Sequence, residues 1–191
     1  NNTLEKTVNQ LKESENKLQI QYDESKKQEE YIRFLAERDF LTNLYNRRKL
    51  SMDLEERLKT NKNGTILFID IDDFKNINDT LGHHYGDKVL QHVSGLLENL
   101  MFINNYTPYR MGGDEFVIDI PNIIDKEKME EVIINLFEIL CKNHYIDNIK
   151  NNITGSIGVV RYPEDATSVD DIVMKADIAM YSAKKLGKNR Y

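Results

Sequence analysis

Several features are scarce or missing in this chain of 191 residues, and each absence excludes a class of protein. The single cysteine, Cys141, can form no internal disulfide and cannot build a Cys-His metal cluster. No apolar run approaches the roughly 20 residues that span a bilayer, and the N-terminus has no apolar signal region. We therefore expect a cytoplasmic chain with no membrane segment in this stretch, while an upstream part of the parent protein could still carry an anchor.

An excess of basic residues is also missing. The chain holds 26 Lys and Arg against 32 Asp and Glu, which gives a net charge of −6. This balance argues against a broad surface for a nucleic-acid polymer, because such surfaces need clustered positive charge. It does not exclude a nucleotide ligand, since a bound divalent cation can carry the phosphate charge.

Residues 1–38 contain neither glycine nor proline and are rich in Glu, Lys, Gln and Asn, which predicts one long helix. Steps of four and three residues trace a heptad seam with seven apolar positions in ten: Leu4, Val8, Leu11, Glu15, Leu18, Tyr22, Ser25, Glu29, Ile32 and Ala36. One interpretation is a solvated connector helix. We favour a parallel dimeric coiled coil that transmits a signal from an upstream sensor domain, because so thin a stripe needs a partner helix. The first residue is not Met, so we expect a piece of a longer protein.

Residues 39–191 alternate between helical and strand patterns and are predicted to form one domain. Apolar residues at helical spacing predict helices over 44–59, 74–80, 86–101, 126–142 and 168–186. Apolar runs bounded by turn signals predict strands over 65–71, 106–111, 115–120 and 153–160. Gly112 and Gly113 lie between two of these strands and predict a hairpin. The expected fold is α+β, with helices packed over a sheet of four or more strands.

Acidic side chains follow two of the predicted strands directly. Three aspartates end the first apolar run and two acids follow the glycine pair: Asp70, Asp72, Asp73, Asp114 and Glu115. Burying unpaired carboxylates is costly, and a hard divalent cation is the usual compensation. If the two strands are neighbours, four or five carboxylates converge, as in a two-metal site for phosphate chemistry. Taken singly, each motif is better explained by a helix cap or a hairpin, whereas together they favour the metal site.

The segment between the two acidic motifs, residues 76–87 (NINDTLGHHYGD), has the side chains needed to read a guanine base. An Asn amide can donate to the purine carbonyl, and an Asp carboxylate can accept from the ring N–H and the exocyclic amine. Two glycines in the segment would let the chain approach the base closely. The alternative is that Asp79 and Asp87 only cap helices and that His83 is a surface residue.

With these motifs in place, the sequence resembles the GGDEF family of bacterial diguanylate cyclases over residues 39–191. The motif that names the family is present within residues 110–116 (RMGGDEF). Three further blocks stand in order at family spacing: 39–48 (DFLTNLYNRR), 70–87 (DIDDFKNINDTLGHHYGD) and 176–190 (ADIAMYSAKKLGKNR). A lone Gly-Gly-Asp-Glu-Phe is a weak signal, but four blocks in order are highly specific.

The resemblance implies a palm-like domain, as in polymerases and adenylate cyclases, with a mostly antiparallel sheet flanked by helices and preceded by the long N-terminal helix. It implies that two GTP condense into cyclic di-GMP with release of two pyrophosphates. Two domains, each holding one GTP, would face each other antiparallel, and each 3′-hydroxyl would attack the α-phosphorus of the other GTP. The chain would then divide into a signalling helix (1–38) that forms the homodimer and a catalytic domain (39–191) that pairs transiently through its active sites.

Matched residue by residue, the family's metal and catalytic roles fall on five positions. Two Mg²⁺ ions, with Mn²⁺ as an alternative, would be held by Asp70, the backbone carbonyl of Ile71, Asp114 and Glu115. Asp114 would also activate the attacking 3′-hydroxyl, and Lys75 would stabilise charge on the phosphates. The catalytic residues implied are therefore Asp114, Glu115 and Lys75.

The same match assigns seven positions to the substrate: Gly112 and Gly113 over the hairpin, Asn78, His83 and Asp87 at the guanine, and Lys184 and Lys188 at the outer phosphates. Asp87 is expected to reject adenine, which lacks the donors that this carboxylate needs, so GTP is predicted over ATP. Lys188 stands where Arg is usual and would make a point-charge contact instead of a bidentate one. The alternative for both lysines is an ordinary cationic helix end.

Many relatives carry an Arg-x-x-Asp product-inhibition site shortly before the glycines, whereas residues 101–109 hold neither Arg nor Asp. We therefore predict no tight product binding there. Two other functions stay open: a catalytically silent module that binds GTP or cyclic di-GMP in signalling, and an oligomerisation piece built around residues 1–38. Silent modules usually have damaged acids, whereas the acids are intact here, which favours the cyclase.

Overall fold

The structure is a computed structural model that describes residues 2–104, 106–122 and 125–191. Its chain divides into two compact units, the first ending at Glu37 and the second running from Arg38 to Tyr191. This boundary lies one residue before the predicted one, and the roles assigned to the two parts stay predictions. No helix in the ranges described is long and apolar enough to cross a membrane.

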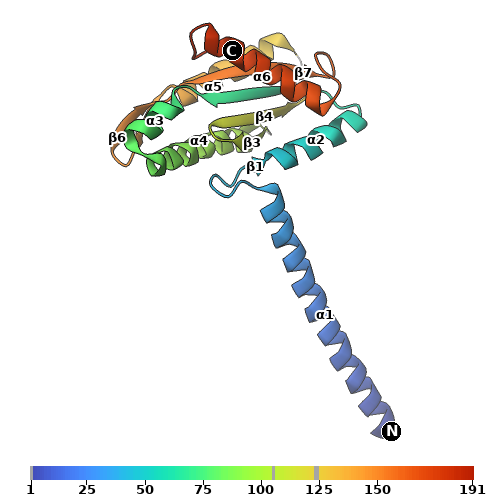
Figure 1. Ribbon diagram of the computed structural model, residues 1–191. Helices are drawn as coiled ribbons and strands as arrows, with labels where there is room; N and C mark the ends of the chain where they lie inside the picture. The colour runs from blue at the N-terminus through green and yellow to red at the C-terminus, as the bar shows by residue number, and fades with distance from the viewer. Residues whose placement is uncertain (1, 105, 123–124) are drawn as a thin grey trace. The chain divides into compact units, whose positions relative to one another are not determined.

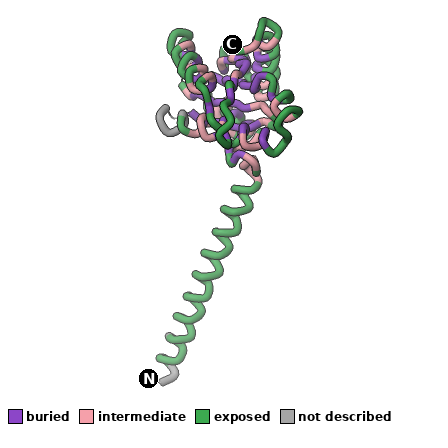
Figure 2. The backbone as a smooth tube through the Cα atoms, turned by 90° about the vertical axis from the view of Figure 1, so that its left-hand side faces the viewer, coloured by how far each residue is buried: buried purple, intermediate pink, exposed green. Residues whose placement is uncertain are grey.

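The first unit is a single helix, α1 (Asn2–Glu37). Five apolar residues of the heptad seam are more than half exposed within the single chain: Leu4, Leu11, Leu18, Tyr22 and Ile32. The Val8 side chain is not among those that the structure describes. Figure 2 shows α1 as exposed along nearly its whole length. The helix itself is confirmed, and the coiled coil stays a prediction.

The second unit is built on a five-stranded sheet with the order β1-β3-β4-β2-β7. Its strands are β1 (Tyr45–Asn46), β2 (Gly64–Ile71), β3 (Thr107–Gly112), β4 (Glu115–Pro121) and β7 (Gly155–Tyr162). All neighbours pair antiparallel except β1 and β3, which pair parallel. Every residue of β2 is buried, as its continuous apolar run predicts. The predicted α+β fold with a mostly antiparallel sheet is confirmed.

Helices cover both faces of this sheet (Figure 1). They are α2 (Arg47–Lys59), α3 (Phe74–Leu81), α4 (His83–Asn104), α5 (Lys126–Leu140) and α6 (Val169–Lys185). Leu67 and Ile69 of β2 pack in one core with α3, α4 and α5, while Ile66 and Phe68 pack in a second core with α2 and α6. Alternate side chains of one strand therefore supply two separate cores, because successive residues point to opposite faces.

Several element boundaries differ from the sequence predictions. Helix α2 begins three residues later than predicted, because residues 45–46 pair with β3 and the Asn46 side chain caps the helix by accepting from the Lys49 backbone N–H. Helix α4 begins at His83, three residues before the predicted start. Helix α5 ends at Leu140 because a hairpin follows at once, formed by β5 (Asn143–Ile146) and β6 (Ile149–Asn152). This hairpin was not predicted.

Candidate active site

The acids of the two predicted motifs meet at one end of the sheet. Asp70, at the end of β2, pairs directly with Glu115, at the start of β4. The Ile71 backbone N–H donates to the Asp114 carbonyl at 3.2 Å, which joins the hairpin turn to the end of β2. Gly113 occupies the turn with a φ of 53°, a left-handed conformation that favours glycine. The condition that the sequence left open is therefore met: the two strands that carry the acids, β2 and β4, are neighbours.

Asp70 is buried and only half satisfied. Its Oδ2 lies 2.7 Å from the Lys184 ammonium of α6, whereas its Oδ1 is buried with no hydrogen-bond partner among the described residues. Burial raises the pKa of Asp70, and the nearby charges of Asp114 and Asp72 raise it further, while Lys184 opposes them. A carboxylate oxygen that is buried without a partner is costly to keep. It is suited to a cation.

Glu115 shares this environment. Burial raises its pKa, and the negative charges of Asp70, Asp177 and Asp114 add to the effect, while Lys184 lowers it. Asp177 lies on α6 and was not among the predicted site residues. Its spacing from Lys184, seven residues along one helix, is the signal that could have placed it on the same face.

Two of the aspartates after β2 do not join the predicted convergence, which is a correction. The Asp72 side chain accepts from Ser156 Oγ at 2.7 Å, from Thr154 Oγ1 at 2.9 Å and from the Asn189 backbone N–H at 3.0 Å. It therefore fixes β7 and the segment after α6. Asp73 is exposed and pairs with Lys188 at 2.6 Å.

The donors that remain suit a divalent cation by their chemistry. Carboxylates on adjacent strands and the unpartnered Asp70 oxygen are hard oxygen ligands. In the part of the chain that the structure describes, however, no group of three or more His, Cys, Asp or Glu side chains is gathered closely enough to hold an ion. The fit to a metal therefore lies in the type of donor and in the unpartnered Asp70 oxygen, and Lys184 is the cation that Asp70 contacts in this structure.

The predicted guanine residues lie where α3 meets α4. Asn78 is half-buried on α3, while His83 begins α4 and Asp87 follows one turn later. Gly86 makes room for this arrangement, because a Cβ there would lie 2.0 Å from Asn78 Oδ1. Asp79 and Asp87 stand at no helix N-cap, so the capping alternative is not supported. Lys75 is exposed near the start of α3.

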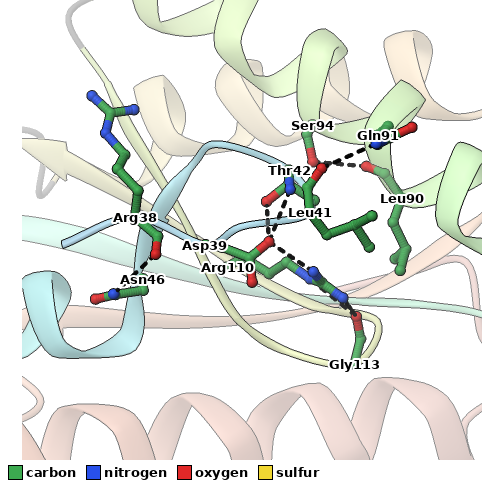
Figure 3. A network of polar contacts seen from close by, with 10 residues as sticks. All are labelled: Arg38, Asp39, Leu41, Thr42, Asn46, Leu90, Gln91, Ser94, Arg110 and Gly113. Atoms are coloured by element: carbon green, nitrogen blue, oxygen red, sulfur yellow. Dashed lines mark hydrogen bonds and ion pairs between the residues drawn. The ribbon is translucent and has the colours of Figure 1, made fainter. Parts of the chain in front are cut away.

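A buried arginine holds the turn of the glycine hairpin (Figure 3). The Arg110 guanidinium donates to the Gly113 carbonyl from Nε at 3.2 Å and from one terminal nitrogen at 2.8 Å. Its other terminal nitrogen contacts Asp39 Oδ1 at 2.7 Å, and that oxygen also accepts from the Thr42 N–H and hydroxyl. Burial alone would raise the pKa of Asp39, but the hydrogen bonds from Thr42 and Arg110 lower it. Both Arg110 and Asp39 stand in the motif blocks, but their contact was not predicted.

A family model described as "Diguanylate cyclase, GGDEF domain" matches residues 36–190. The chain belongs to the GGDEF family. This GGDEF chain is 32% identical over 155 residues to diguanylate cyclase VdcA of Vibrio cholerae, an overlap that covers 80% of the chain and 45% of VdcA. It is 40% identical over 126 residues to diguanylate cyclase A of Treponema denticola, covering 66% of the chain and 34% of that protein. The chain spans less than half the length of these curated relatives.

Solved GGDEF structures show the same fold. A sensory box/GGDEF family protein from Caulobacter crescentus matches with a TM-score of 0.71 and 30% identity, over 79% of this chain and 99% of that one. The coiled coil and GGDEF domain of DgcB from Caulobacter crescentus, solved with c-di-GMP, match with a TM-score of 0.79 and 24% identity. The match covers 94% of this chain and 97% of the DgcB chain. The stretch 101–109 of this GGDEF chain, which lacks Arg-x-x-Asp, lies partly outside the described residues, so the absence of tight product binding there stays a prediction.

Proposed function

We propose that the chain is a diguanylate cyclase that condenses two GTP into cyclic di-GMP and releases two pyrophosphates. The observation that carries this proposal is the buried, half-satisfied carboxylate of Asp70 beside Glu115, at the glycine hairpin of a GGDEF domain. Family membership supplies the reaction class. The intact acids argue against the silent binding module, in which such residues are usually damaged.

In this proposal each domain holds one GTP and supplies half of the reaction. When two domains face each other antiparallel, each 3′-hydroxyl oxygen forms a bond to the α-phosphorus of the other GTP, and each bond to pyrophosphate breaks. Asp114 accepts the hydroxyl proton, and Lys75 stabilises the charge that develops on the phosphates. Lys184 and Lys188 bind the outer phosphates.

Asp70, the Ile71 carbonyl, Asp114 and Glu115 would hold two Mg²⁺ ions, with Mn²⁺ as an alternative. A bound divalent ion would lower the pKa of the attacking hydroxyl and neutralise phosphate charge. Support for these ligands comes from the unpartnered Asp70 oxygen and from the strand pairing that places Glu115 next to it.

Base selection is proposed to fall on the corner of α3 and α4. The Asn78 amide donates to the guanine carbonyl, and Asp87 accepts from the ring N–H and the exocyclic amine, with His83 alongside. Since adenine lacks those donors, GTP should be used and ATP refused. The exposed seam of α1 supports the further proposal that this helix forms the homodimer and links it to an upstream sensor.

The test is incubation of concentrated protein with GTP and Mg²⁺, followed by mass spectrometry of the products, with ATP in a parallel sample. Cyclic di-GMP from the parent chain and none from a Glu115→Ala variant would support the proposal and connect the activity to the acidic hairpin. Tight binding of GTP without product, even with the domains held as a dimer, would favour the silent module. Absence of both binding and product would overturn the assignment of the site.

A further inference from the structure

Both lysines that are proposed to bind phosphate are paired with carboxylates in this structure. Lys184 Nζ lies 2.7 Å from Asp70 Oδ2, and Lys188 Nζ lies 2.6 Å from Asp73 Oδ1. The two pairs differ in burial. The Asp70 side chain is only 7% exposed, whereas the Lys188–Asp73 pair is exposed on both sides and contributes little. The Lys184–Asp70 pair is therefore the one that affects the energy of the site.

The two oxygens of Asp70 are in different states. Lys184 satisfies Oδ2, while Oδ1 is buried without a hydrogen-bond partner in the described part of the chain. A single ammonium on a flexible stem therefore neutralises the charge of Asp70 without completing its coordination. The carboxylate keeps an open position for a stronger cation.

We propose that Lys184 is a placeholder cation: it occupies Asp70 until metal and nucleotide arrive together, and it then moves to the phosphates. The proposal rests on the proposed function, because it takes Asp70 as a metal ligand and Lys184 as a phosphate ligand. What it adds is that Lys184 binds two partners in turn, first the Asp70 carboxylate and then the phosphates. Metal that arrives without nucleotide must therefore compete with Lys184 for Asp70.

The competition follows from charge and distance. A divalent ion on Asp70 would meet the Lys184 ammonium beside the same carboxylate, and two cations at that range repel each other. The Lys184 ammonium is able to leave Asp70, because the lysine side chain is 31% exposed and is a flexible stem on the last turn of α6. The backbone there is held in place, since the neighbouring Ala183 is buried.

Nucleotide removes the penalty of moving the lysine. Triphosphate offers Lys184 a new anionic partner, so Asp70 is released to the metal without leaving an unpaired ammonium behind. Metal and nucleotide then bind with positive coupling, and each raises the affinity for the other by the same factor. Metal without nucleotide binds weakly.

Removing Lys184 should therefore have two effects of opposite sign. Metal alone should bind more tightly, because its competitor is gone. A complex of Mg²⁺ with a non-hydrolysable GTP analogue should bind more weakly, because a phosphate contact is gone. A lysine that only binds phosphate predicts the second effect and not the first.

The test is titration of nucleotide-free protein with Mn²⁺, with free ion measured by electron paramagnetic resonance. We expect Lys184→Met to bind Mn²⁺ about tenfold more tightly than the parent, within the usual range of coupling between two sites. Lys184→Gln should show the same direction, which covers the case in which the Met variant fails to fold. Lys185→Met is the matched control, because it removes the same charge from an exposed neighbour that lies over the Tyr181 ring and not on Asp70.

A double variant, Asp70→Asn with Lys184→Met, should lose the gain, because the ion would have lost its anchor. Equal affinity for Mn²⁺ in the Lys184 and Lys185 variants would overturn the proposal, as would a gain that persists in the double variant. The readout needs no turnover. If Mn²⁺ binding behaves as expected but the parent makes no cyclic di-GMP even with the domains held as a dimer, the proposed function fails, whereas the competition between Lys184 and metal at Asp70 stands.

Discussion

At the scale of single residues, Arg110 joins two segments that lie far apart in the sequence. Its guanidinium is only 8% exposed and contacts Asp39, 71 positions earlier, as well as the carbonyl of Gly113 in the hairpin turn. Charged hydrogen bonds in a buried place are worth more than exposed ones, and they leave costly unpaired groups when one partner is removed. Arg110 is therefore a positioning residue for the hairpin that carries Asp114 and Glu115.

Replacing Arg110 by Ala should lower the free energy of unfolding by about 1–3 kcal/mol at neutral pH, since Asp39 and the Gly113 carbonyl lose their donor. The pKa of Asp39 is below its ordinary value of 3.8 in the fold, so its contribution to stability is present above that value and lost as the pH falls through the lower folded pKa. The difference between parent and variant, measured by urea unfolding, should therefore shrink in acid below that value.

Arg161→Ala is the control for this prediction, because Arg161 makes ion pairs with Glu164 and Asp165 that are exposed. Its loss should leave the unfolding midpoint nearly unchanged. An Arg110 variant as stable as the Arg161 variant would show that the contact to the hairpin is not needed for the fold.

Single residues also show where sequence reasoning reaches its limit. Asp70 and Glu115 were expected near each other if their strands were neighbours, and the two residues pair directly between β2 and β4. Asp114 lies in the adjoining turn, where its backbone carbonyl accepts from the Ile71 N–H. Asp72 was expected in the same cluster, because it directly follows the apolar run that carries Asp70. Strand β2 ends at Ile71, however, and the chain turns at Asp73 with a φ of 57°. The Asp72 side chain therefore meets β7 instead.

At the scale of elements, the contact between α6 and β7 depends on one glycine. A Cβ at Gly158 would lie 2.0 Å from the Ala176 carbonyl oxygen and 2.5 Å from the Met180 nitrogen, both backbone atoms of α6. Backbone atoms cannot move aside as a flexible side chain can. Gly158 therefore sets how closely the helix that carries Lys184 approaches the sheet.

Gly158→Ala should push α6 away from β7 and lower the free energy of unfolding by about 3 kcal/mol or more. Gly95→Ala is the matched control, since Gly95 lies within α4 and a Cβ there would meet no atom within 4 Å among the residues described. That change should stabilise the protein by up to about 1 kcal/mol through helix propensity. Chemical denaturation measures both, and two variants of equal stability would contradict the packing argument.

Long elements with a clear period were predicted from the sequence, and short ones were not. Strands β2, β3 and β4 and helices α3 and α6 were found close to their expected limits. Strand β1 has only two residues and is defined by its pairing with β3, so no local pattern could show it. The β5–β6 hairpin did carry a sequence signal, the Asp147-Asn148 pair, because Asp and Asn tolerate the positive φ that both residues adopt in this turn.

At the scale of the whole molecule, the proposed reaction needs two copies, because one domain holds one GTP. One long feature that could bring copies together is the apolar seam of α1, in which Leu4, Leu11, Leu18, Tyr22 and Ile32 are exposed in the single chain. Figure 2 shows the helix coloured as exposed along nearly its whole length. Coiled-coil pairing would bury that seam, and burial of each leucine contributes about 1.5–3 kcal/mol. Activity should therefore follow the integrity of the seam.

Leu11→Asp with Leu18→Asp should weaken the dimer at least about tenfold, because two charges would enter a buried seam. The yield of cyclic di-GMP at fixed protein concentration should fall with it, while unfolding of residues 38–191 stays as in the parent. Asn9→Asp with Asn16→Asp makes the same charge change on the opposite side of the helix and should alter neither property. Light scattering and product analysis measure the two effects. If the Leu variant loses its dimer yet keeps full activity, the catalytic domains meet without α1 and the helix has another role.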